Sequence, residues 1–499
     1  MDRIRNAINA RIDASLPGEE GGLAKALITG DRGGVSDEVQ QAMRDSGLAH
    51  ILSISGLHMM LMAGTVFWAL RALLASIPAL ALRFPIKKWA AAASLAAALF
   101  YLAISGAALP TIRAWIMMSI VLLAVILDRP AITMRNVALA ALAILIVAPE
   151  SVFDPSFEMS FAAVIALVAL YEAMAGRKRP ELDDVSLTWR TLRFAWLAIW
   201  AAGVTTTVAG LATAPFAAYH FHRVSYYGLA ANLLAAPIVG LLVMPMALLS
   251  VVAMPLHLEH VPLLVMGVGL DALVWVGETV AAWPGAISIV PSMSGTSLFL
   301  IVAGGLWLCL VHGALRQAGW AAIALGLFTA GTAPRPDLLI EREGKAMAVR
   351  GEDGLLALLP GSHKNYSAQK WLEADGDARD PALAAQSESF TCDSLGCLTA
   401  LGTRRVAFLT DPAAAEEDCR SADILIAQFY APKICAGPAV VVDRRSLRDN
   451  GAYALYLVDG SLRIETVGEV RGRRPWAVTT VAQESLGSGR PDRVRLGKK

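Results

Sequence analysis

The amino-acid sequence predicts an all-α polytopic membrane domain of about ten transmembrane helices, followed by a soluble α/β domain. The chain has 499 residues, of which 56% are hydrophobic and only 17% charged, and its mean hydropathy is +0.53. These values are outside the range of soluble domains. The apolar residues concentrate in residues 50–333, whereas residues 334–499 have an ordinary polar composition.

Ten apolar segments in residues 50–333 approach bilayer length, which for a helix is roughly 20 residues. The seventh contains Pro237, Pro245 and Pro255, which predicts either one kinked span or two half-spans. The fourth and tenth are short, so the total lies between nine and eleven. The segments are 50–77, 89–106, 111–127, 137–149, 157–175, 194–213, 227–253, 263–283, 297–312 and 319–333.

Lysine and arginine cluster in the odd-numbered connections between these segments. The even-numbered second and fourth connections contain neither residue, although His222 and Arg223 occupy the sixth. The positive-inside rule then places the odd connections in the cytoplasm and both chain termini outside it. The basic residues concerned are Arg83, Lys87, Lys88, Arg129, Arg135, Arg177, Lys178, Arg179 and Arg316.

The polar ends of the chain are predicted to lie outside the membrane. Residues 1–49 form an extracytoplasmic lead-in that is too short for a core of its own, and we expect no cleavable signal peptide there. Residues 334–470 alternate strand-like runs (338–350, 405–410, 423–429, 440–443 and 453–458) with helix-capable stretches, which predicts one soluble α/β domain. Residues 471–499 form a basic tail, predicted to be disordered.

Four of the five cysteines, Cys392, Cys397, Cys419 and Cys435, fall in the C-terminal domain. In an extracytoplasmic domain they could form two disulfides, with three possible pairings. Free thiols and a metal site are the alternatives, but the spacing matches no paired C-x-x-C pattern. We therefore expect no metal site and no cofactor.

Polar residues interrupt the first apolar segment. Ser53, Ser55, Gly56 and His58 lie in a run that otherwise suits lipid, and a polar group without a partner in hydrocarbon costs several kcal/mol. The pattern indicates a helix that faces protein or a water-filled path. The alternative is that the hydroxyl groups bond to their own helix and His58 is a packing residue.

Arg113 is the only basic residue in residues 89–127. A buried arginine is costly unless it is paired or lines water, so Arg113 is a candidate for a translocation path, with an interfacial position as the alternative. Asp154 and Glu158 are four residues apart, and Ser160 follows them. These three are candidates for structural pairing, with Arg113 or as a helix cap.

Asn232 and Pro237 lie in the proline-interrupted seventh segment. Broken helices at membrane depth are tolerated mainly where they line a cavity or are buried in protein. The two residues are therefore further candidates for a translocation path, and kinking for helix packing is the alternative.

Four sequence blocks resemble the ComEC family, the inner-membrane DNA-uptake channels of transformable bacteria. The first block, residues 47–58, reads GLAHILSISGLH and is similar to the start of the family's competence region. The other three follow in the family's order, and the resemblance covers residues 46–333. They comprise residues 105–107 with 113–114, residues 154–161, and residues 215–221 with 224–225 and 232–237.

The resemblance implies an inner-membrane channel that takes up single-stranded DNA during natural transformation. Its partners would be single-stranded DNA, membrane lipids, a DNA receptor outside the cell, and an ATPase or helicase in the cytoplasm, because the chain contains no Gly-x-x-x-x-Gly-Lys motif. The alternative is a secondary transporter or flippase for a small polar or lipid-linked substrate. An internal inverted repeat would favour that alternative, and we find none.

The chain departs from the family at both ends. Only 49 residues precede His50, where family members commonly have additional spans and an OB-like domain. Many members end in a metallo-β-lactamase-like domain with an H-x-H-x-D-H zinc motif, whereas this C-terminal domain has a single histidine, His363. We expect a degenerate, metal-free relative of that fold and no enzymatic activity, because a hydrolytic metal site needs several converging ligands.

Overall fold

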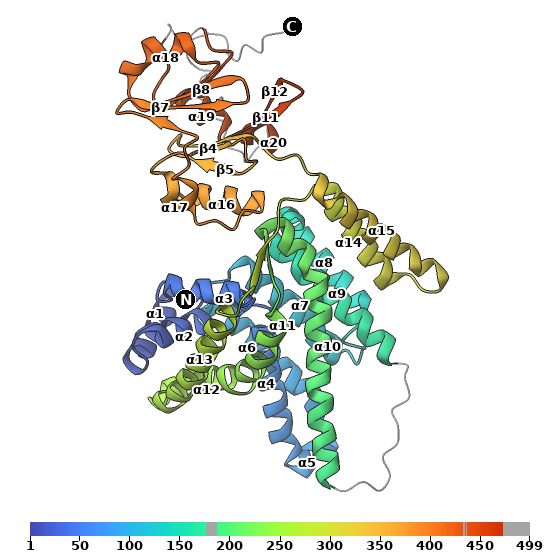
Figure 1. The fold of residues 1–499 in the computed structure, drawn as a ribbon. Coiled ribbons are helices and arrows are strands. Elements are labelled where there is room, and N and C mark those ends of the chain that lie inside the picture. Colours follow the sequence, from blue (N-terminus) through green and yellow to red (C-terminus); the bar gives the residue numbers. More distant parts are fainter. Residues whose placement is uncertain (176–186, 433–434, 436, 473–499) are drawn as a thin grey trace, which may run out of the picture. The chain divides into compact units, whose positions relative to one another are not determined.

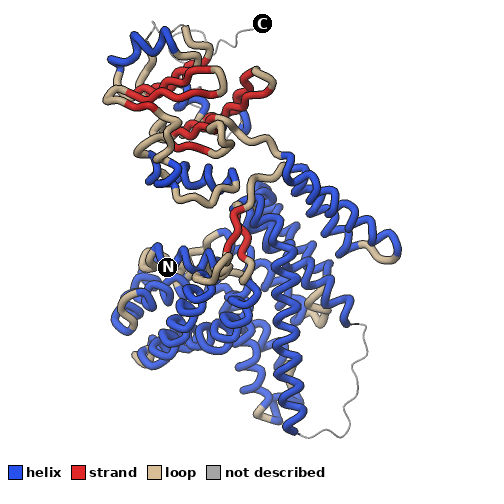
Figure 2. The backbone as a smooth tube through the Cα atoms, in the orientation of Figure 1, coloured by secondary structure: helices blue, strands red, loops and turns tan. Residues whose placement is uncertain are grey.

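The computed structural model describes residues 1–175, 187–432, 435 and 437–472 (Figure 1). The chain forms two compact units. The first comprises Met1–Ser288 and Gly295–Thr329, and the second comprises Ile289–Ser294 and the residues from Ala330 onward. Helices dominate the first unit, and both five-stranded sheets belong to the second (Figure 2). The predicted tail from residue 473, and Arg177, Lys178 and Arg179 of the fifth connection, lie outside the described residues.

Residues 1–49 fold into three helices: α1 (Asp2–Ser15), α2 (Glu19–Ile28) and α3 (Asp37–Asp45). Their apolar residues, such as Ile12, Leu27 and Met43, are at most 2% exposed and share one buried cluster with the apolar helices that follow. The N-terminal segment therefore has no separate core, and it buries its apolar side against the rest of the first unit.

Seven described helical segments are long and apolar enough to cross a membrane, when residues 228–256 are counted as one, and α8 and α14 are shorter apolar helices. The chain is a multi-pass membrane protein. The helices of this region are α4 (Gly56–Ala75), α5 (Pro78–Arg83), α6 (Ile86–Ile104), α7 (Leu109–Ile126), α8 (Met134–Val147), α9 (Pro155–Ala175), α10 (Leu187–Phe221), α11 (Gly228–Pro237), α12 (Met244–Ala253), α13 (His260–Ala281), α14 (Gly295–Leu310) and α15 (Ala318–Thr329).

The prolines of residues 228–256 widen the helix without ending it. After Pro237 the chain makes a π-helix (Ile238–Val243) and continues as α12, and Pro255 lies in a final 3-10 turn (Met254–Leu256). A proline ring clashes with the carbonyl four residues earlier, and π-helical turns are a common way to absorb such a defect. The segment is thus one bent helical path.

The second unit contains two five-stranded sheets, in the orders β10-β9-β8-β7-β6 and β12-β11-β3-β4-β5. β10, β9 and β8 are parallel, and the other pairs are antiparallel. The strands are β3 (Leu338–Ile340), β4 (Met347–Arg350), β5 (Leu356–Leu358), β6 (Thr391–Cys392), β7 (Gly396–Leu401), β8 (Arg404–Leu409), β9 (Ile424–Ala427), β10 (Val440–Val442), β11 (Tyr453–Val458) and β12 (Ser461–Thr466); the first unit holds β1 (Arg223–Ser225), which pairs with β2 (Ile287–Ile289).

Alternating side chains of these strands enter different cores, because successive residues of a strand point to opposite faces. Val406 and Phe408 of β8 pack in the core that the two sheets share, whereas Ala407 and Leu409 pack against α18 (Ala415–Ser421). α16 (Tyr366–Asp375) and α17 (Pro381–Ala384) cover the outer face of the other sheet. The unit therefore has four layers, helix–sheet–sheet–helix, and it ends with α19 (Arg444–Asn450) and α20 (Val467–Arg471).

Two disulfides join the four cysteines of the second unit. Cys392 is bonded to Cys397 across the β6–β7 pair, where the two residues are register partners. Cys419 of α18 is bonded to Cys435. Cys309 in α14 is the free cysteine of the described residues.

We expect one reactive thiol per chain after denaturation without reductant, and five after reduction. Alkylation with a mass-tagged maleimide, followed by gel mobility, measures this number, and the Cys309→Ser variant should lose the single tag. Five tags without reductant would contradict the disulfides. Disulfides persist in oxidising compartments. A single tag without reductant would therefore also place the second unit outside the cytoplasm.

Candidate functional site

The first predicted polar residues form the entry to α4. α4 begins at Gly56, six residues later than the predicted span, because residues 49–51 form a 3-10 turn and Ser55 is the residue that caps the helix. The backbone N–H of Ser55 donates to Nδ1 of His58 (3.2 Å). Ser53 accepts a hydrogen bond from Arg32 (2.8 Å). Ser53 and Ser55 therefore lie before the helix and not within it.

His58 is completely buried, and its second ring nitrogen lacks a partner. Since the N–H of Ser55 can only donate, Nδ1 is the acceptor, and Nε2 carries the proton in the neutral imidazole. Among the described residues, Nε2 has no hydrogen-bond partner. Buried N–H groups are nearly always paired. The Nε2–H group of His58 is therefore a hydrogen-bond donor for which the described residues provide no acceptor.

α7 has two polar faces that point in different directions. Ala114, Trp115 and Leu122 pack in the same core as α4 and α6, whereas Met117 and Ile120 pack against α8 and α9. Of the polar residues of α7, only Arg113 was predicted as a candidate, and it lies on the second face. The first face was missed, although its spacing of four residues (111, 115, 119) was readable in the sequence.

Thr111, Trp115 and Ser119 follow one another at every fourth residue of α7, and Trp115 packs in the core that α7 shares with α4 and α6. The hydroxyl of Thr111 donates to the carbonyl of Ile54 (3.5 Å), which sets the start of α7 beside the start of α4. Trp115 Nε1 and Ser119 Oγ are buried and have no partner within the described part of the chain. We call His58, Thr111, Trp115 and Ser119 the α4–α7 polar seam.

The other face of α7 is clamped to the start of α9 through Arg113. The side chain of Arg113 is only 5% exposed, and its guanidinium donates to Asp154 Oδ1 (3.1 Å) and to the hydroxyl of Ser156. Asp154 precedes α9 and also accepts from the backbone N–H groups of Ser156 (2.9 Å) and Phe157 (3.2 Å). One carboxylate therefore caps α9 and neutralises Arg113.

Burial would raise the pKa of the Asp154 carboxyl, but the hydrogen bonds from Ser156 and Arg113 outweigh it, so the pKa is below its ordinary value. Asp154 is therefore ionised at neutral pH and able to balance the Arg113 charge. Within the described residues, Arg113 Nε has no partner.

The remaining candidates are placed elsewhere. Glu158 contacts His220 of α10 (2.6 Å) and not Arg113. Asp154 lies before α9 whereas Glu158 lies within it, so the two carboxylates do not lie on one helix face. Ser160 is exposed. Asn232 donates to Gly228 of its own helix (2.7 Å), and Pro237 ends α11. The described hydrogen bonds do not join Asn232 or Pro237 to the other predicted residues.

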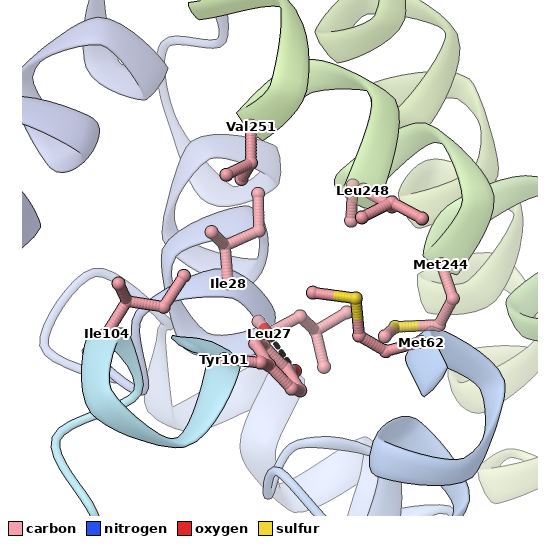
Figure 3. A pocket seen from close by; sticks show the side chains of 9 residues that line it. Leu27, Ile28, Met62, Tyr101, Ile104, Met244, Leu248 and Val251 are labelled. Carbon is pink, nitrogen blue, oxygen red and sulfur yellow. Dashed lines mark hydrogen bonds between the residues drawn. The ribbon is translucent and has the colours of Figure 1, made fainter. Parts of the chain in front are cut away.

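A small apolar cavity of about 10 Å³ lies between α2, α4, α6 and α12 (Figure 3). Leu27, Met62, Tyr101 and Met244 are among its lining residues, and the Tyr101 hydroxyl donates to the carbonyl of Leu27 (2.6 Å). This volume is at the lower limit for one water molecule. The helices are therefore closely packed at this point.

The Arg113–Asp154 pair predicts an asymmetric loss of stability. Asp154→Asn leaves a buried arginine without a counter-charge and should cost about 3 kcal/mol. Arg113→Met leaves a carboxylate whose side chain is 38% exposed, so the loss should be smaller, about 1 kcal/mol. Thermal unfolding of the detergent-purified variants measures both values. Equal losses, or a larger loss for Arg113→Met, would contradict the clamp.

The Competence protein family model matches residues 27–315 of this chain. "ComE operon protein 3" of Bacillus subtilis (strain 168) is 25% identical over 254 residues, which are 51% of this chain and 29% of that protein. "Competence protein ComA" of Neisseria gonorrhoeae is 29% identical over 339 residues, which are 68% of this chain and 44% of that protein.

The matched regions thus cover less than half the length of each of these relatives. No solved structure matches the chain, and the metallo-β-lactamase-like assignment of the second unit stays a prediction. The family model spans more than half of the sequence and includes α4, α7 and α9 with the residues described above. The chain belongs to the Competence protein family.

Proposed function

We propose that this protein is an inner-membrane channel for uptake of single-stranded DNA during natural transformation. The proposal rests on the family match and on one structural observation, the unmet N–H and O–H donors of the α4–α7 polar seam. His58, Trp115 and Ser119 each bury a donor for which the described residues provide no acceptor. Nucleic acid supplies acceptors along its whole length, on phosphates and on base edges.

The two faces of α7 would have different roles. The seam face lines the path of the strand, and Trp115 offers an aromatic surface on which bases can stack. Arg113 is a positioning residue, because Asp154 neutralises its charge and the pair fixes α7 to α9. The state described is closed, since α4 and α7 pack together and the nearby cavity holds at most one water molecule. Passage requires these helices to separate.

We further propose that partners supply binding and energy. Because the chain contains no Gly-x-x-x-x-Gly-Lys motif, an ATPase or helicase in the cytoplasm would drive transport. A receptor outside the cell would deliver DNA. The second unit, with a single histidine, would act as a docking platform and not as a hydrolase.

Ser119→Ala tests the seam without a charge change. The substitution removes a buried hydroxyl that has no partner, so stability should be unchanged or higher. Transformation frequency with external DNA should nevertheless fall roughly fivefold, the effect of losing a hydrogen bond of about 1 kcal/mol to the strand. The assay uses a transformable bacterium whose own copy is replaced, with membrane abundance measured by immunoblot.

Ser94→Ala is the matched control, because Ser94 is also buried but bonds to the carbonyl of Ala90 in its own helix (2.8 Å). We expect it to leave transformation unchanged. Normal uptake by Ser119→Ala would remove the seam from the path. Normal uptake after complete deletion of the gene would overturn the channel itself.

A further inference from the structure

The loop between α12 and α13 lies on an unexpected side of the first unit. In the predicted topology this seventh connection lies opposite the N-terminal segment and the second and sixth connections. Two ion pairs agree with the predicted grouping of three other connections and the N-terminal segment. Lys88 of the first connection pairs with Asp128 of the third (2.5 Å), and Arg223 of the sixth pairs with Asp45 of α3 (3.1 Å).

Arg11 of α1, however, binds the tip of the α12–α13 hairpin. Its guanidinium donates to the carbonyl of Met254, to Glu259 Oε1 (3.2 Å) and to a ring nitrogen of His257 (3.0 Å). Arg5, only six residues or about 9 Å earlier on the same helix, lies against Gly106 of the second connection. The hairpin tip is therefore near the end of the bundle where α6 finishes.

The packing of α12 agrees with this position. Val251 lines the same small cavity as Ile104, the last residue of α6, and Val251 is five residues, about 7 Å, from Leu256 at the tip. The opposite end of α6, at Ile86, is about 27 Å away along that helix. Gly240, near the middle of the bent segment, contacts Leu61, only five residues inside α4.

The two sides of the hairpin differ in their surroundings. α13 packs on the N-terminal helices, with Gly267 against Leu16 and Gly277 against Met43. Residues 1–49 contain 14 charged side chains, which cannot enter hydrocarbon cheaply. The other side of the hairpin exposes large apolar side chains, each at least 45% accessible: Val252, Leu256, Leu258, Val261, Leu264 and Val268.

We propose that the α12–α13 hairpin does not cross the membrane. The hairpin enters the membrane leaflet on the side where α6 ends, and it leaves the membrane on that same side. Its apolar face contacts lipid acyl chains, while α1–α3 cover the other face at the level of the headgroups. Arg11 holds the tip through the carboxylate of Glu259 and the carbonyl of Met254. This arrangement preserves the direction of the later spans, because the hairpin replaces two crossings.

Cysteine accessibility tests the side on which the tip lies. In a Cys309→Ser background, three exposed positions are compared: His260→Cys beside the tip, Ala108→Cys after α6, and Lys87→Cys at the start of α6. A membrane-impermeant maleimide is applied to right-side-out and inside-out membrane vesicles. We expect His260→Cys to be labelled in the same vesicles as Ala108→Cys. Labelling together with Lys87→Cys would overturn the proposal.

A nitroxide at Val261→Cys tests the contact with lipid in the purified protein reconstituted in phospholipid vesicles. We expect relaxation by dissolved oxygen, which concentrates in acyl chains, to exceed relaxation by a water-soluble nickel chelate. The reverse order would show that the apolar face meets water or protein and would overturn the lipid contact. Neither measurement depends on DNA uptake, so both can fail or succeed independently of the proposed function.

Discussion

The buried ion pair between Arg113 and Asp154 is the constraint on which the matched region depends. A guanidinium with 5% of its side chain exposed requires a counter-charge, and the carboxylate that supplies it also caps α9. Rotation of α7 is thereby fixed, because Arg113 must face α9. The same rotation turns Trp115 into the core that α7 shares with α4 and brings Thr111 to the carbonyl of Ile54, and Ser119 follows one turn after Trp115. The polar seam is thus a geometric consequence of the pair.

Much of this could be predicted from local patterns. The apolar runs indicated the helices, and short strand-like runs indicated β8, β9 and β11. Asp154 was expected to pair with Arg113 or to cap a helix, and the structure shows it doing both. These features follow from nearby sequence or from the rule that a buried charge needs a partner.

Other features depend on long-range packing that no local pattern encodes. Glu158 meets His220 of α10, 62 residues later, and Arg11 meets Glu259, 248 residues later. Residues 1–49 read as a separate polar segment because 14 charged side chains are interspersed among their apolar residues. Residues 228–256 and α13 each have the apolar length of a crossing helix, and only the contacts with α1 and α6 indicate a hairpin that returns to the same side.

Photocrosslinking of the transported strand would show whether DNA passes along the α4–α7 polar seam. A photoreactive phenylalanine analogue replaces Trp115 on the seam face, or Leu123, which is 44% exposed on α7, and cells are irradiated while they take up labelled DNA. We expect DNA to become attached at position 115 and not at position 123. Equal attachment at both positions, or none at 115 while uptake continues, would contradict a path along the α4–α7 polar seam.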